Sequence, residues 1–326
     1  MAYPDELKVA LSAVRKAATL CRTVRSALSD IPSMQKEDRS PVTLADFGSQ
    51  ALIGMELNRA FPDVPVVGEE ASENLQNQPV LSRKVMELVN RENPKLTLSQ
   101  VLEAIDIGAQ EPDNAARFWT LDPIDGTKGF LRGNQYAVAL ALIENGAVAL
   151  GVLGCPNFSA RFQDPASDKG CIMYAVRGEG AWMKDLDGDA DACAISVDNI
   201  KDGRSARFCE SFESAHASHD VHQQISSVLG ITKPPMRLDS QVKYAAIARG
   251  DASIYFRLPR QKDYREKIWD HAAGSIIVEE AGGKVTDFQG QPIDFSAGKR
   301  LRNNSGIIAT NGYLHRKVLE AISQVV

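Results

Sequence analysis

Two apolar runs separated by a tight-turn signal are the feature that most restricts the fold of this chain. Residues 137–143 and 148–153 are rich in Ala, Val and Leu, and Glu144-Asn145-Gly146 between them is typical of a β-hairpin turn. A third apolar run, residues 118–121, precedes them, and segments with helical periodicity flank all three. Antiparallel strands between helices do not follow the strict alternation of a parallel sheet, so the sequence predicts an α+β fold, a sandwich of layers.

Apolar periodicity predicts the other helices and strands. Helices are expected at residues 4–28, from about 43, at about 80–90, 99–107, 218–229, 242–249, 269–281 and 315–325. Further strands are expected at residues 64–67, 172–176, 206–209, 254–258 and 306–309.

The length of 326 residues corresponds to about two domains at roughly 150 residues each. The turn-rich stretch 185–191 (DLDGDAD) marks the expected boundary. We therefore expect an N-terminal α+β domain at 1–190, in which residues 71–115 form a polar helical excursion, and a C-terminal α/β domain at 191–326.

Composition excludes several classes of protein. The net charge of −5 provides no basic surface for wrapping nucleic acid or docking on an anionic membrane. The longest strongly apolar stretch, YAVALALI at 136–143, is eight residues, far below the roughly 20 that a membrane span needs. No targeting signal is recognisable, and the five cysteines form no CxxC pair. We expect a cytoplasmic protein, by default a monomer, without a disulfide framework or a zinc site.

The strongest chemical signal is LDPIDGTKGF at 121–130. Asp122 and Asp125 flank Pro123-Ile124 directly after an apolar strand, and because proline restricts the backbone, a turn there would bring both carboxylates to one side. Gly126 and Thr127 follow, where free N–H groups at a helix start would face an anion. Taken alone, an ordinary capped turn explains the motif about equally well.

Three other acidic positions favour a metal site. Glu69-Glu70 follows a short strand, Asp46 lies in the first turn of a helix, and Asp270 lies at the start of another. Asp46 and Asp270, taken singly, are also explained as first-turn acids that interact with the helix dipole. As a set without Cys or His, these carboxylates suit Mg²⁺ rather than zinc.

These residues carry a resemblance to a known family. The blocks Gly68-Glu69-Glu70, DPIDGT at 122–127 and WDHAAG at 269–274 resemble the signatures of the lithium-sensitive, magnesium-dependent phosphatase superfamily that contains inositol monophosphatase and fructose-bisphosphatase. The 3'(2'),5'-bisphosphate nucleotidases are the most similar group within it. Their blocks resemble SPVT at 40–43, GTKGFLRG at 126–133, SAHASHD at 214–220, DSQVK at 239–243 and EKIWDHAAG at 266–274.

The resemblance implies a fold and a metal site. The fold would be a layered αβαβα sandwich over nearly the whole chain. Two or three Mg²⁺ ions would be held by Glu69, Asp122, Asp125, Asp270 and the backbone carbonyl of Ile124. Only the first residue of the Glu69-Glu70 pair matches a ligand position. Asp46 would pair with Thr127 to orient and activate a water on the metal.

The resemblance also implies a nucleotide end of the site. Ser240, Lys243 and Arg257 would contact substrate phosphates, and Gly126, Thr127 and Asp239 would also bind the substrate. Judged without it, DSQVK reads as a helix cap and Arg257 as a surface arginine. Glu213 and His216 would border an adenine pocket, whereas His219 and Asp220 would be structural. His216, His219 and His222 recur every third residue, but each step of three turns by about 60° on a helix, so the outer pair diverges by about 120°, and no Cys or fourth histidine lies near, so we reject zinc.

The sequence therefore predicts a magnesium-dependent phosphoric monoester hydrolase. The expected reaction removes the 3'-phosphate of adenosine 3',5'-bisphosphate, and that of its 5'-phosphosulfate analogue, by attack of an activated water. Two alternatives stay open. One is an inositol (poly)phosphate phosphatase of the same superfamily. The other is a sensor that binds the nucleotide without hydrolysing it, which the presence of Asp46, Thr127 and all the acids disfavours.

Overall fold

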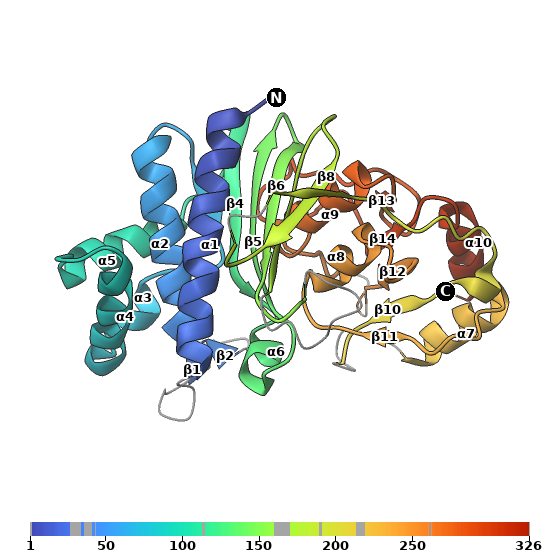
Figure 1. The fold of residues 1–326 in the computed structure, drawn as a ribbon, viewed down its shortest axis with the longest axis horizontal. Helices are drawn as coiled ribbons and strands as arrows, with labels where there is room; N and C mark the ends of the chain where they lie inside the picture. The colour runs from blue at the N-terminus through green and yellow to red at the C-terminus, as the bar shows by residue number, and fades with distance from the viewer. Residues whose placement is uncertain are drawn as a thin grey trace.

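Two β-sheets separated by helices form the centre of the molecule (Figure 1). The structure is a computed structural model, and it describes residues 2–26, 34–35, 41–42, 44–112, 115–159, 170–188, 191–212, 219–259, 261 and 263–325. The larger sheet has seven strands in the order β3-β4-β5-β6-β7-β8-β9, and the smaller has five in the order β11-β10-β12-β14-β13. Every neighbouring pair in the large sheet is antiparallel except β3 and β4, which are parallel.

The strands are mostly short. Those of the large sheet are β3 Val66–Gly68, β4 Arg117–Asp125, β5 Ala137–Glu144, β6 Ala147–Cys155, β7 Cys171–Val176, β8 Ala181–Asp185 and β9 Cys193–Ile195. Those of the small sheet are β10 Phe208–Glu210, β11 Met236–Arg237, β12 Ile254–Arg257, β13 Lys284–Thr286 and β14 Ile307–Thr310. A separate pair consists of β1 Met34–Gln35 and β2 Pro41–Val42.

Helices cover both sheets and fill the space between them. They are α1 Pro4–Ser26, α2 Leu44–Ala60, α3 Glu73–Gln76, α4 Pro79–Glu92, α5 Leu98–Asp106, α6 Thr127–Arg132, α7 His219–Leu229, α8 Val242–Ala248, α9 Ala272–Glu280 and α10 His315–Val325. Two 3₁₀ turns lie at Gly203–Ser205 and Ile268–Asp270.

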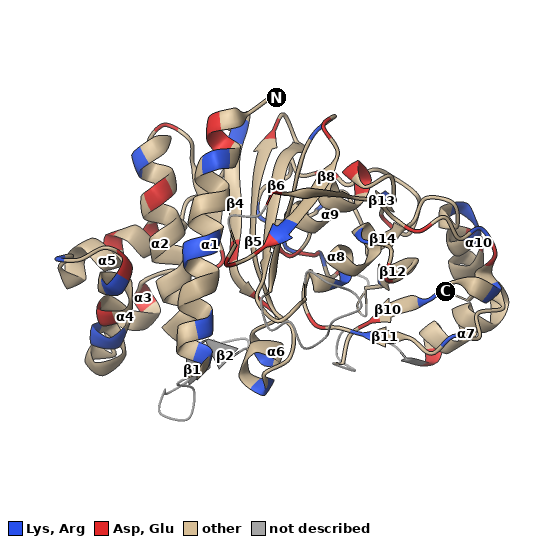
Figure 2. Cartoon of the chain, in the orientation of Figure 1, with Lys and Arg blue, Asp and Glu red and all other residues tan. Residues whose placement is uncertain are grey.

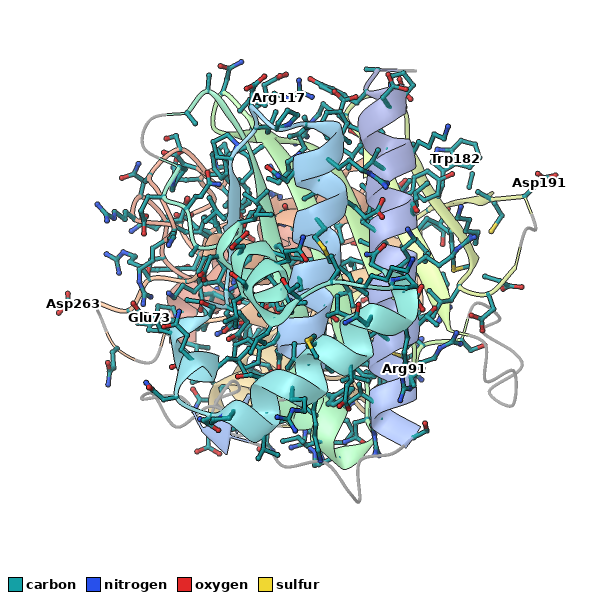
Figure 3. The ribbon with its side chains drawn as sticks, turned by 90° about the vertical axis from the view of Figure 1, so that its left-hand side faces the viewer. Glu73, Arg91, Arg117, Trp182, Asp191 and Asp263 are labelled. Carbon is teal, nitrogen blue, oxygen red and sulfur yellow. The ribbon has the colours of Figure 1, made fainter. Side chains whose placement is uncertain are left out.

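Three apolar clusters hold the layers together. The first packs α1 and α2 on one face of the large sheet, and Figure 3 shows these two helices side by side in front of that sheet. The second fills the space between the sheets around α8 and α9, and the third packs α7 and α10 on the outer face of the small sheet. The layers therefore follow the order α, β, α, β, α, and the predicted αβαβα sandwich is confirmed.

Burial of α9 explains its sequence. Residues 272–278 (AAGSIIV) are all buried, because the helix contacts strands of the large sheet on one side and of the small sheet on the other. A helix enclosed in this way needs apolar or small residues all round rather than on a single stripe. The division into domains at residues 190 and 191 stays a prediction. α9 packs closely against both sheets, and β9, just beyond the expected boundary, pairs with β8 of the large sheet.

The predicted elements differ from the structure in three places. The chain does not turn after Leu121, since β4 continues through Asp125. The helix expected at 269–281 is divided: a 3₁₀ turn at Ile268–Asp270 precedes α9, which begins at Ala272. The strands β8, β9, β11 and β13 were not predicted. Their sequence signals are weak, because they are short and are defined by pairing with other segments of the sheets. Among the described residues, no helix has the length and apolar character to cross a membrane.

Candidate active site

A pocket of about 210 Å³ lies where the end of β4 and the start of α6 meet α8, β12 and the turn before α9. It is lined by Glu69, Asp122, Ile124, Asp125, Gly126, Thr127, Lys128, Gly129, Ser211, His222, Asp239, Ser240, Gln241, Lys243, Tyr244, Tyr255, Phe256, Arg257 and Asp270. The segments that form it are far apart in the sequence. The pocket thus brings the predicted metal ligands and the predicted phosphate contacts to one place.

A bulge in β4 presents the two central carboxylates. Asp122 pairs with Ala139 and Asp125 with Ala137, so β4 has one residue more than β5 over this stretch. Pro123 has no N–H to donate to the ladder, and the N–H of Ile124 donates to Oδ1 of Asp122 at 3.1 Å. A bulge rather than the expected turn therefore directs Asp122 and Asp125 to the pocket.

The carboxylates of the site repel one another. Burial raises the pKa of Asp122 well above its usual value, and the nearby charges of Glu69, Asp125, Asp270 and Asp46 raise it further. Burial likewise raises the pKa of Asp125 to about 6 and that of Asp270 to about 7, although Lys243 and Arg257 respectively oppose the rise. Burial and mutual repulsion make the ionised form of these acids unfavourable, and a cation bound among them would stabilise it.

Glu69 reaches the site because β3 runs parallel to β4. Gly68 pairs with Leu121, so Glu69, which follows β3, is brought beside Asp122 of β4. Gln50, which is fully buried, fixes the following turn: its Nε2 donates to the Glu70 carbonyl at 2.6 Å and its Oε1 accepts from the Glu70 N–H at 3.0 Å. Sequence reasoning missed Gln50, because one glutamine in a helix carries no signal of such a role.

The two predicted catalytic residues occupy the starts of two helices. Asp46 lies in the first turn of α2 and is 1% exposed, and its charge acts on Asp122. Thr127 begins α6, and its Oγ1 donates to the Ile124 carbonyl at 3.2 Å. That carbonyl is the predicted backbone ligand of the metal. The direct pair between Asp46 and Thr127 stays a prediction.

Gln241 joins the two halves of the site. Its N–H donates to Oδ2 of Asp125, its Nε2 donates to the Trp269 carbonyl at 2.9 Å, and its Oε1 accepts from the Gly274 N–H at 2.9 Å. The side chain is 1% exposed. Gln241 therefore fixes the turn that carries Asp270 relative to β4, a role that the DSQVK motif alone did not reveal.

The predicted phosphate contacts Ser240, Lys243 and Arg257 line the same pocket. Lys243 is buried, with Nζ 5.4 Å from the centre of the Tyr255 ring, and burial lowers its pKa although Asp125 opposes the shift. The hydroxyl of Ser240, in the turn before α8, accepts from the N–H of Val242 at 3.2 Å. Asp239 accepts from Nη2 of Arg132 at 2.7 Å, so this carboxylate is already ion-paired. Figure 2 shows the basic residues of α6, from which Arg132 comes.

Arg257 is not a surface arginine, because its side chain is only 18% exposed. Its Nε lies 3.0 Å from Oε1 of Glu266, and its Nη1 lies 3.6 Å from Oδ2 of Asp270. Glu266, Asp270 and His271 each place a potential ligand atom within 4.8 Å of the others. Arg257 therefore lies beside two members of this cluster, Glu266 and Asp270, and also lines the pocket.

The expected adenine contacts, Glu213 and His216, lie outside the described residues. Another histidine of the same run lines the pocket instead. His222 is 6% exposed, its Nδ1 lies 3.4 Å from Oε2 of Glu210, and its ring centre lies 4.1 Å from that of Phe256. The every-third-residue pattern singled out His222, but only for a zinc site that we rejected. Its position beside Phe256 depends on the packing of α7 on the small sheet.

Comparison with known proteins identifies the fold and the family. An IMPase of Thermotoga maritima superposes with a TM-score of 0.67 at 23% identity, over 98% of each chain. The suhB protein of Bartonella henselae superposes with a TM-score of 0.69 at 21% identity, over 99% of this chain and all of the other.

Relatives with higher identity extend over the whole chain. The 3'(2'),5'-bisphosphate nucleotidase of Schizosaccharomyces pombe is 42% identical over 100% of this chain and 97% of its own length. That of Oryza sativa is 44% identical over 99% of this chain and 95% of its own length. The model of the inositol monophosphatase family matches residues 4–326. The chain therefore belongs to the inositol monophosphatase family.

Proposed function

We propose that this enzyme is a Mg²⁺-dependent 3'(2'),5'-bisphosphate nucleotidase that converts adenosine 3',5'-bisphosphate to AMP and phosphate. The observation that carries the proposal is the pocket itself, which is lined both by the four predicted metal-binding carboxylates, Glu69, Asp122, Asp125 and Asp270, and by the cations Lys243 and Arg257. Relatives that are 42–44% identical over 95–97% of their own length are named for this activity. The 5'-phosphosulfate analogue, which would give adenylyl sulfate, is the second proposed substrate.

The acidic side of the pocket fits a magnesium site. Its side-chain donors are all carboxylates, and the mutual repulsion recorded at Asp122 is what bound cations would relieve. The proposed ligands are Glu69, Asp122, Asp125, Asp270 and the Ile124 carbonyl, with two or three ions in all. When bound, Mg²⁺ would lower the pKa of a coordinated water and neutralise charge on the phosphoryl group and the leaving oxygen.

In the proposed mechanism the protein contributes position and proton transfer. Asp46 and Thr127 orient the attacking water, with Asp46 as the proton acceptor and the Thr127 hydroxyl as its hydrogen-bonding partner. In the structure the Thr127 hydroxyl donates its single proton to the Ile124 carbonyl, so for this role the proton would turn from that carbonyl to Asp46. The water attacks the 3'-phosphorus in line with the ester oxygen, the P–O bond to the ribose breaks, and the 3'-hydroxyl takes up a proton.

The basic side of the pocket would select a substrate with a second anionic group. Lys243 and Arg257 supply two fixed positive charges in a buried setting, where they act more strongly than in water. His222 also lines the pocket and is the proposed neighbour of the nucleobase, whereas Phe256 is 1% exposed and packs into the apolar cluster on the outer face of the small sheet. An inositol monophosphate has neither a second anionic group nor a nucleobase, which is why we rank the nucleotide above it. Cytoplasmic removal of the by-product of sulfate-group transfer is the proposed role, carried out by a monomer.

Phosphate release tests the proposal. Adenosine 3',5'-bisphosphate, inositol 1-phosphate and 5'-AMP are incubated with the enzyme and Mg²⁺, each with and without millimolar Li⁺. We expect release from the bisphosphate alone, suppression by Li⁺ and loss of activity in Asp122→Ala. Preferential release from the inositol compound would favour the inositol phosphatase, and binding of the bisphosphate without any release would favour the sensor.

A further inference from the structure

A buried chain of polar side chains leads from the pocket into the space between the two sheets. It begins at Asp270 and Arg257, which line the pocket, and continues through Glu266 to His271 and Tyr244. Nε2 of His271 lies 3.4 Å from Oε2 of Glu266, and Nδ1 of His271 lies 2.8 Å from the Tyr244 hydroxyl. Glu266 is 4% exposed, and His271 and Tyr244 are each 1% exposed.

Glu266 is the member of this row of polar side chains that contacts Arg257 of the pocket. One carboxylate oxygen faces Arg257 at 3.0 Å, whereas Asp270 lies at the longer distance of 3.6 Å from the same guanidinium. A guanidinium shared between two carboxylates is attracted less exclusively to either of them. The closer contact of Arg257 is therefore with Glu266 and not with Asp270.

A second metal site is not the best explanation of the Glu266, Asp270 and His271 cluster. The positive charge of Arg257 already lies beside two of its three members. His271 is turned toward the Tyr244 hydroxyl through its other ring nitrogen. The cluster is therefore arranged to hold an arginine rather than to surround an ion.

Close packing and hydrogen bonds fix the positions of these polar side chains. Tyr244 packs edge to face on Tyr255, with ring centres 5.2 Å apart. Gly274 makes room for Tyr244, because a Cβ at position 274 would lie 2.4 Å from Cδ2 of the ring. Gln241 fixes the same turn through its bonds to Trp269 and Gly274. Packing and hydrogen bonds of this kind lock the side chains in place.

We propose that Glu266 is a positioning residue that keeps Asp270 available for the metal and Arg257 available for the substrate's second anionic group. The proposal rests on the function proposed above. Without the negative charge of Glu266, Arg257 would close on Asp270, so that the metal and the substrate would each compete with an internal ion pair. His271 and Tyr244 hold Glu266 in the orientation that prevents this.

The test compares Glu266→Gln with the unaltered enzyme. Partners that orient metal ligands typically change metal affinity or activity about 10- to 100-fold when they are replaced, so we expect the Mg²⁺ concentration for half-maximal activity to rise by about that factor. The KM for adenosine 3',5'-bisphosphate should also rise, whereas kcat at saturating Mg²⁺ and substrate should change far less. Glu266→Asp, which keeps the charge, should recover part of the Mg²⁺ affinity.

Calorimetry supplies a readout that does not depend on turnover. In Glu266→Gln we expect weaker binding of Mg²⁺ alone, and weaker binding of adenosine 3',5'-bisphosphate in EDTA. Tyr244→Phe removes only the hydroxyl at the end of the chain, so it should shift both affinities in the same direction by a smaller factor. It also provides a second test if Glu266→Gln does not fold.

A matched control is Glu279→Gln on α9, which removes a carboxylate from a pair with Arg177 (2.7 Å). It should leave the Mg²⁺ and nucleotide affinities unchanged. If the unaltered enzyme is active and Glu266→Gln has the same Mg²⁺ and nucleotide affinities as Glu279→Gln, the positioning role is overturned and the proposed function stays intact. A fall in kcat with unchanged affinities would also overturn it. Weaker Mg²⁺ binding by Glu266→Gln, together with no phosphate release by the unaltered protein, would support the positioning role and reject the proposed function.

Discussion

Gly126 lies against Ser240 where the two halves of the pocket meet: a Cβ on Gly126 would lie 2.8 Å from Cβ of Ser240. Both residues have positive φ, 88° for Gly126 and 64° for Ser240. Only glycine adopts such angles without cost, and a serine there is uncommon. Two unusual backbone turns thus touch with no room for another carbon atom, one before α6 and the other before α8.

Gly126→Ala should therefore affect both stability and binding. The positive φ and the short contact together should lower the free energy of unfolding by about 1–3 kcal/mol, and displacement of Ser240 should raise the KM for the bisphosphate. Urea unfolding and initial rates measure the two effects. Gly178→Ala is the matched control, since Gly178 has φ 81° with nothing within 4 Å of an added Cβ. Equal effects of both substitutions would reject the contact with Ser240 as the cause.

Thr127→Val tests the catalytic hydroxyl without changing the shape of the side chain. The hydroxyl now donates to the Ile124 carbonyl and is proposed to orient the attacking water. Loss of a group that positions or transfers a proton typically costs about 10²–10⁴-fold, so we expect kcat to fall within that range. Thr127→Ser, which keeps the hydroxyl, should retain most of the activity. Comparable rates for the Val and Ser variants would exclude the hydroxyl from the mechanism.

The layers of the fold were predictable because their signals are local. The hairpin at β5 and β6 and the apolar stripe of α1 are visible in short windows of sequence. β9 and β11 have two or three residues each, so they become strands only when distant partners pair with them. The bulge at Asp122 was also missed, since a proline between two aspartates is as compatible with a turn as with a distorted strand.

The candidate site shows the same division. The carboxylates were predicted because each follows a strand or begins a helix, and these places are recognisable in sequence. Gln50 and Gln241 were not, because a buried glutamine differs from an exposed one only through the distant backbone groups that it binds. The environment of Arg257 was beyond reach for the same reason. Its partner Glu266 becomes its neighbour only after β12 is in place.

Mg²⁺ should stabilise the protein through the repelling carboxylates. We expect a higher Tm in Mg²⁺ than in EDTA, because the raised pKa values of Asp122, Asp125 and Asp270 record a cost of ionisation that a bound cation removes. Asp122→Asn removes one buried charge, so its Tm in EDTA should exceed that of the unaltered protein. The same variant should lose most of the Tm increase with Mg²⁺. A full increase in Asp122→Asn would show that Mg²⁺ stabilises the protein elsewhere.

His315 makes stability depend on pH at a place away from the pocket. Its Nε2 lies 2.9 Å from the Thr286 hydroxyl and its Nδ1 lies 3.0 Å from that of Thr310, and burial lowers its pKa to about 4. Between about pH 4 and the usual histidine pKa of about 6.5, the unfolded chain therefore binds more protons than the folded one. The stability that His315 contributes is present above about pH 6.5 and is lost as the pH falls toward 4.

His315→Gln isolates this contribution, because glutamine can still form hydrogen bonds and does not titrate. Urea unfolding at pH 5 and pH 7 should show a smaller loss of stability at pH 5 in the variant than in the unaltered protein. The other titrating groups are common to both proteins, so the difference between the two losses belongs to His315. An identical loss in both proteins would mean that His315 does not resist protonation in the folded state, and that burial beside the two threonines does not exclude its charged form.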